Sequence, residues 1–309
     1  MPLPLILWGA AAALAATGVV KGTQAVSTMN DAKELGERAE RRHRSKIKEL
    51  DKARDDTNKR FEELGQLKVE IFTHQIKHII DVIKKTKGSS STLKNFENTF
   101  STEELKQMEQ MVARSVELER GLLTGAAAGT LAGFGAYSSV GILATASTGT
   151  AISTLSGVAA TNATLAWLGG GSLAAGGFGM AGGMIALGGI VAGPALAIGG
   201  FMLASKAEEA MTAARQYRDE VDVAIEKIEN GEVLLASLRE NADELTYALI
   251  ELVDRFESVK VDDATDDQAF NKMIAMGKAI KSLLDTNIMN EDGTPVVGVK
   301  QTCTGLAQC

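Results

Sequence analysis

The sequence contains no charged residue between Arg120 and Lys206. Residues 121–205, 85 in a row, therefore include no Asp, Glu, Lys, Arg or His. A run of this length is far longer than the roughly 20 apolar residues that one membrane-spanning helix needs. It is rich in Gly and Ala, which does not fit an ordinary globular domain.

Cysteine is also scarce, and the catalytic motifs that can be read from a sequence are missing. Cys303 and Cys309 both lie in the last seven residues, so they make no disulfide framework. The chain has no P-loop, no nucleophile elbow and no CxxC pair. The sequence therefore predicts a protein that is not an enzyme and that binds no cofactor.

Two weaker patterns are interpreted as chance. Gly177 to Gly182 matches GxGxxG, but a dinucleotide site needs an acidic residue about 20 positions further on, and the next carboxylate here is Glu208. His74 and His78 are four residues apart on an expected helix, yet a metal site needs at least one more ligand. No metal site is expected.

Acidic residues outnumber basic residues, and this affects which class of partner is expected. The net charge is −7, and no Lys/Arg face with interleaved aromatic residues is visible, so nucleic acid is not expected as a partner. The basic stretch from Arg38 to Lys48 is either a solvated helix face or a contact for anionic lipid headgroups.

Outside the uncharged run, charge is dense while aromatic residues and proline are few, with three of the chain's four prolines. This composition is typical of long, solvent-exposed helices. The predicted fold class is all-α: a long helical bundle or coiled-coil stalk that carries a Gly/Ala-rich, membrane-type hydrophobic helical hairpin.

The composition changes along the chain predict five segments. They are an apolar amino-terminal segment (1–29), charged helices (30–120, with a linker at about 88–101), the uncharged hairpin (121–205), a long heptad helix (206–260), and a short amphipathic helix with an irregular tail (261–309). Leu3 to Val20 either spans a membrane or packs in a soluble bundle. Ser101 and Glu104 have the spacing of a capping box, which predicts a helix start there.

Glycine spacing predicts how the uncharged hairpin packs. Gly121, Gly125, Gly129 and Gly133 recur every four residues, so a helix places them on one stripe where another backbone can approach closely. Breaks between helices are expected at the triple glycine and at Pro194. The remaining residues assigned to the membrane or packing surface are Trp167, Gly169, Gly170 and Gly171.

The segment after the run has the most regular apolar pattern. Apolar residues recur in alternating steps of four and three from Leu203 to Val259, with Gly231 as the exception. Such a repeat predicts a coiled-coil seam or a long bundle helix. The central seam residues are Val221, Ile228, Leu235, Leu238, Leu245, Leu249, Leu252 and Phe256.

Charged helices thus flank an uncharged hairpin, GLLTGAAAGTLAGFGAYSSVG followed by WLGGGSLAAGGFGMAGGMIALGGIVAGPALAIGG. This layout, over residues 102–260, resembles the bacterial relatives of apolipoprotein L. It is also similar to the α-helical pore-forming toxins of the haemolysin E and tripartite haemolysin class. Both resemblances are architectural, and they imply membrane insertion or remodelling by a helical protein without enzymatic activity.

The expected function is that of a membrane-inserting helical protein, a pore-forming or membrane-remodelling effector acting through its glycine-rich hairpin. The alternative is a membrane-anchored coiled-coil scaffold or structural assembly protein. The expected partners are a lipid bilayer and either further copies of the chain or a helical partner protein. Arg120 and Lys206 flank the run with positive charge, which predicts an even number of crossings, with the charged helices on the cytoplasmic side.

Overall fold

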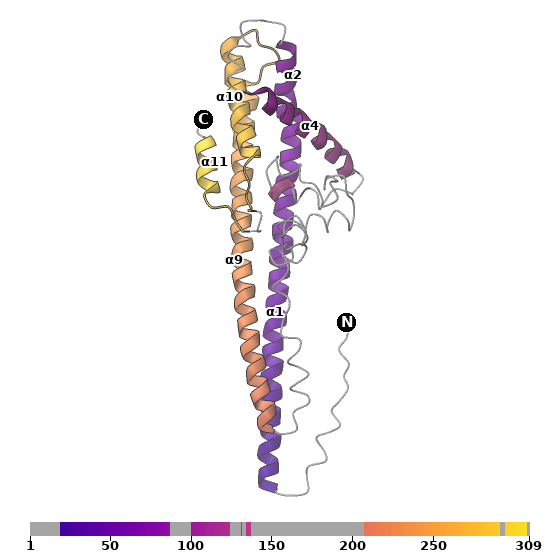
Figure 1. Ribbon diagram of the computed structural model, residues 1–309, viewed down its shortest axis with the longest axis vertical. Coiled ribbons are helices and arrows are strands. Elements are labelled where there is room, and N and C mark those ends of the chain that lie inside the picture. Colours follow the sequence, from indigo (N-terminus) through magenta and orange to yellow (C-terminus); the bar gives the residue numbers. More distant parts are fainter. Residues whose placement is uncertain are drawn as a thin grey trace. The chain divides into compact units, whose positions relative to one another are not determined.

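The computed structural model describes residues 19–86, 100–123, 131, 134–136, 207–290 and 294–307. These residues are mostly helical, as the sequence predicts (Figure 1). The elements are α1 (Val19–Ile71), the π-helix η1 (Phe72–Ile76), α2 (Lys77–Thr86), α4 (Thr102–Leu123), α9 (Ala207–Val259), α10 (Asp267–Leu284) and α11 (Val299–Ala307).

The chain divides into two compact units, and α1 and α9 each contribute to both. Unit 1 holds the described part of α1 up to Asp51 and of α9 up to Gly231. Unit 2 holds the other described residues, which begin at Lys52 in α1 and at Glu232 in α9. Each unit is described separately below.

In unit 1, α1 and α9 pack side by side and run in the same direction. Ala32 of α1 packs with Ala210 and Ala214 near the start of α9. Further along both helices, Arg42 pairs with Asp222 at 2.8 Å. Residue numbers therefore rise together on the two helices, so they are parallel.

The basic stretch from Arg38 to Lys48 is engaged in ion pairs on the surface of unit 1. Three pairs join residues four apart on α1, so they lie on adjacent turns: Arg38 with Glu34, Arg41 with Glu37, and Arg44 with Glu40. These side chains are exposed, except that Glu40 is half-buried. Each such pair contributes little, about 0.3–0.5 kcal/mol.

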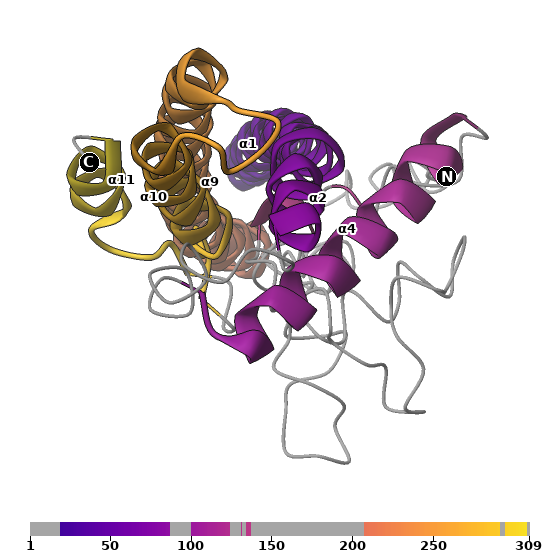
Figure 2. The ribbon, with the colours of Figure 1, turned by 90° about the horizontal axis from the view of Figure 1, so that it is seen from above.

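In unit 2 the same two helices are again parallel. Arg239 Nη1 donates to the carbonyl of Ala53 at 3.2 Å, and Gln75 Nε2 donates to Glu257 at 2.8 Å. α4 lies across α2 and packs on both η1 and α2 (Figure 2). α10 folds back beside α9 and contacts η1, which completes the core of this unit.

The apolar stripe of α9 is its buried face. The seam residues Val221, Ile228, Leu235, Leu238, Leu245, Leu249, Leu252 and Phe256 are each at most 3% exposed. Burial of this stripe follows from the three-four repeat, because that spacing keeps apolar side chains on one side of a helix. Knobs-into-holes packing of a true coiled coil stays a prediction.

The capping box at the start of α4 is confirmed. Ser101 N–H donates to Glu104 Oε2 at 2.7 Å, and Glu104 N–H donates to Ser101 Oγ at 3.1 Å. α10 begins in a related way, because Asp266 accepts hydrogen bonds from the N–H groups of Gln268 and Ala269. Both helices therefore start at residues that satisfy otherwise unpaired amides.

The end of the chain is more regular than the expected irregular tail. Met289 and Pro295 form an isolated antiparallel bridge, and α11 follows from Val299. Gly298 has a positive φ of 88°, a conformation that glycine adopts without strain, and it directly precedes α11. Cys303, which the sequence places in a tail, is buried on α11.

We expect the buried stripe of α9 to dominate the stability of unit 2. Leu249→Ala removes a fully buried side chain and should lower the free energy of unfolding by about 2–5 kcal/mol. Ile250→Ala, one residue further and 47% exposed, is the matched control and should change it by less than ~1 kcal/mol. Urea unfolding followed by circular dichroism measures both, and equal effects would contradict the assigned burial.

Candidate functional site

Most of the glycines assigned to the hairpin surface fall outside the described residues. These are Gly125, Gly129, Gly133, Gly169, Gly170 and Gly171, together with Trp167 and Pro194. Gly121 is half-buried near the end of α4. Beyond the end of α4, the uncharged run is described where it meets α1, and this place is the candidate site.

Beyond the end of α4 at Leu123, the described residues of the run are Leu131 and Phe134–Ala136, called here the docked segment. All four residues are helical and buried. The ring of Phe134 lies 6.0 Å from the ring of Phe72, centroid to centroid. Leu131 and Phe134 belong to the same apolar core as Phe61 and Leu64 of α1. This part of the uncharged run therefore packs inside the protein.

Two glycines allow the docked segment to approach the backbone of α1. A Cβ on Gly65 would clash with the carbonyl group of Leu131, whose carbon would lie at 2.8 Å. A Cβ on Gly135 would clash in the same way with the carbonyl group of Phe61, again with the carbon at 2.8 Å. Both positions therefore require glycine, because any side chain would force the two backbones apart.

Sequence reasoning placed close packing on a different glycine stripe and missed this pair. A signal was present, since Gly65 interrupts a charged helix in which glycine costs about 1 kcal/mol relative to alanine. The sequence gives no comparable signal for Gly135, the partner of Gly65. Gly135 is one of many glycines in the run, and nothing local distinguishes it from its neighbours.

Lys68 is the charged residue at this site, and its side chain is fully buried. Its Nζ donates to the carbonyl oxygens of Phe134 at 3.4 Å and Gly135 at 3.2 Å. Burial lowers the pKa of Lys68 from 10.5 to about 7, and the nearby Asp285 carboxylate only partly opposes this shift. Sequence analysis did not single out Lys68, because a lysine on a charged helix is normally exposed.

The end of the chain closes over the docked segment. Ile288 N–H donates to the carbonyl oxygen of Ala136 at 3.4 Å. The amide of Asn241 on α9 donates to the carbonyl oxygens of Ile288 at 3.1 Å and Val296 at 2.9 Å. The turn containing the Met289–Pro295 bridge is thus fixed to α9, and it supplies one hydrogen bond to the docked segment.

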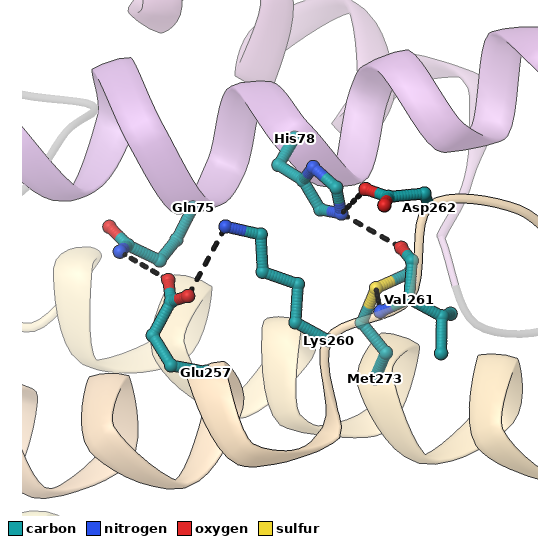
Figure 3. Close-up of polar contacts among 7 residues, drawn as sticks. All are labelled: Gln75, His78, Glu257, Lys260, Val261, Asp262 and Met273. Carbon is teal, nitrogen blue, oxygen red and sulfur yellow. Dashed lines mark hydrogen bonds and ion pairs between the residues drawn. The ribbon is translucent and has the colours of Figure 1, made fainter.

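His74 and His78 lie one helical turn apart and bind different backbone groups. His78 Nε2 lies 2.8 Å from the carbonyl oxygen of Val261, just after α9 (Figure 3). His74 Nδ1 lies 2.9 Å from the carbonyl oxygen of Glu70, on its own helix. Within the described ranges no group of three or more His, Cys, Asp or Glu side chains could hold a metal ion.

Side chains near His78 attach the end of α9 to η1. Glu257 accepts hydrogen bonds from Gln75 at 2.8 Å and from Lys260 at 3.2 Å (Figure 3). Partial burial would raise the pKa of Glu257, but these two hydrogen bonds outweigh it and lower that pKa. The carboxylate stays ionised at neutral pH and pairs with the amide of Gln75, which is a structural role.

Cys303 has no feature of a reactive thiol. It is buried on α11, and burial together with Glu244 raises its pKa to about 11. The thiol is therefore protonated at neutral pH, and a protonated thiol is a poor nucleophile. Cys309 lies outside the described residues.

Comparison with known proteins adds no further assignment. No protein family, curated protein or solved structure matches the chain. None of the helices in the described part of the chain has the length and apolar character needed to cross a membrane.

The glycine contact gives a direct test of the docked segment. Gly65→Ala should destabilise the protein by about 1–3 kcal/mol, because the new methyl group overpacks a backbone contact. Gly36→Ala on the same helix is the control: a Cβ there meets nothing within 4 Å, so it should stabilise by up to ~1 kcal/mol through helix propensity. Urea unfolding compares the two, and a stabilising Gly65→Ala would refute the contact.

Proposed function

We propose that this chain is a membrane-inserting helical protein whose uncharged run enters a lipid bilayer. The observation that carries this proposal is the parallel packing of α1 and α9 in unit 1. α1 begins at Val19, directly after an apolar stretch, and α9 begins at Ala207, directly after the uncharged run. Both apolar stretches therefore connect to the same end of unit 1, where one bilayer can receive them.

Exposed apolar side chains near this end support the proposal. Val26 is 60% exposed and Met29 is 41% exposed, both on the first turns of α1 before its contact with α9 at Ala32. Apolar side chains at the start of a helix can lie at the boundary between headgroups and acyl chains, where their burial is favourable.

The docked segment supports the proposal that the uncharged run has two states, one packed in the protein and one inserted in a bilayer. Leu131 and Phe134–Ala136 belong to the uncharged run, and they pack in the core of unit 2. Glycine and alanine permit this close packing, and the same residues permit close helix packing in a bilayer. A segment with comparable free energies in the two environments responds to whichever environment is present.

The proposed partners follow from this arrangement. The bilayer is the first partner, and the charged helices stay on the cytoplasmic side because basic residues flank the run on both sides. Further copies of the chain or a helical partner would complete the inserted assembly. This function needs no catalytic residue and no cofactor.

A second candidate is a membrane-anchored scaffold, in which the helix pair is the functional surface. In each unit α9 buries part of its apolar stripe and runs parallel to α1, which favours this candidate because parallel helices are suitable spacers. Dye release from vesicles separates the two candidates. An anchor binds vesicles and leaves them sealed, whereas a pore-forming or remodelling protein releases the dye.

Vesicle flotation tests insertion directly. Leu187→Asp with Ile190→Asp places two charges in the uncharged run, each costing roughly 2.5–3.5 kcal/mol at a bilayer centre, and should abolish flotation. Val233→Asp with Tyr247→Asp is the matched control, because both residues are exposed on α9, and it should float like the unchanged protein. Equal flotation of both double variants would refute insertion of the run.

The orientation of unit 1 can be tested by fluorophore depth. In a background with Cys303→Ala and Cys309→Ser, a label on Val26→Cys should be quenched by brominated lipid. A label on Ser45→Cys, about 28 Å further along α1 at 1.5 Å per residue, should be quenched by aqueous iodide instead. The reverse pattern would show that the other end of unit 1 faces the membrane.

A further inference from the structure

We propose that Lys68 makes the contact between the docked segment and α1 metastable, so that this contact can open and release the docked segment. The docked segment is Leu131 with Phe134–Ala136, as defined above. The use of this opening for membrane insertion rests on the proposed function, whereas the metastability of the contact itself does not.

The position of Lys68 on α1 is the first observation. Phe61, Leu64 and Ile71 are spaced in the same steps of three and four as Lys68, and all are at most 3% exposed. An apolar side chain at position 68 would complete this stripe. A lysine there places an amine in the core between α1 and the docked segment, which is unfavourable for the charged form.

The groups that surround the amine are the second observation. The docked segment offers it two carbonyl oxygens, those of Phe134 and Gly135, which a neutral amine can satisfy with its two N–H bonds. The Asp285 carboxylate, at the end of α10, acts on the amine and partly opposes the effect of burial on its pKa. Asp285 also pairs with Lys281 at 2.5 Å.

The direction of the pH dependence follows from these surroundings. In the docked state the pKa of Lys68 is about 7, and in the released state it returns toward 10.5. Between these values the released state binds more protons, so docking strengthens as pH rises from 7 through 10.5. Below pH 7 the amine is protonated in both states, and docking stays at its weakest. At neutral pH the contact is therefore near its weakest.

Hydrogen exchange on the full chain in solution, without vesicles, tests this proposal. After correction for intrinsic rates, protection of the amides in residues 131–136 should rise about 5-fold from pH 7 to 8 and about 50-fold from pH 7 to 9. It should be nearly constant below pH 6.5. Protection that does not change with pH would overturn the proposal.

Two substitutions at position 68 and one control complete the test. Lys68→Met keeps the length of the side chain without the charge, so protection should be higher than in the unchanged protein at pH 7 and independent of pH. Lys77→Met removes an exposed lysine of α2 and should leave the pH dependence unchanged. If Lys68→Met fails to fold, Lys68→Arg replaces it. Its guanidinium stays protonated, so protection should be low at every pH.

The link to membranes is measured separately. Lys68→Met should float with vesicles several-fold less than the unchanged protein at pH 7, because the docked segment is released less often. Unchanged flotation, alongside the expected exchange behaviour, would overturn the role of Lys68 in insertion and leave its effect on docking in place. Failure of the unchanged protein to float would instead refute the proposed function.

Discussion

The packing of the apolar stripe of α9 against α1 is the contact on which the rest of the described structure depends. On α9 the stripe is apolar almost throughout, and its residues from Val221 to Phe256 are buried. On α1 and η1 the matching stripe is mixed, because Thr57 and Lys68 of α1 and Gln75 of η1 are buried among apolar neighbours. The apolar side supplies most of the favourable burial, at about 25 cal/mol per Å². The mixed side must find a partner for each polar group.

Thr57, Lys68 and Gln75 make their hydrogen bonds in different ways. Thr57 Oγ1 donates to the carbonyl oxygen of Ala53 on its own helix at 2.7 Å, and Gln75 binds Glu257 of α9. Lys68 instead binds carbonyl oxygens of the docked segment. Within the core of unit 2 its hydrogen bonds are therefore made with a third element, which an apolar side chain at this position would not need.

The uncharged run combines properties that suit both a protein core and a bilayer. Small residues let the backbone at Gly135 meet the backbone at Gly65, and the absence of charge removes any need for ion pairs. In water these properties support docking on α1. In a bilayer the same properties support helix packing without a strong driving force between helices. The composition therefore defines what the run tolerates, while the surroundings decide where it lies.

The sequence by itself determined the helices, the capping box at Ser101 and the buried face of α9, because periodicity and capping act between residues a few positions apart. It also predicts that the uncharged run is the functional segment. Only the tertiary structure decided that α1 and α9 are parallel, that Gly65 meets Gly135, that Lys68 is buried and that the end of the chain is ordered. These features depend on contacts between residues far apart in the chain, such as Lys68 with Gly135 and Asn241 with Ile288. A local sequence pattern cannot identify such pairs, because many glycines and lysines in this sequence have equivalent neighbours and only packing selects among them.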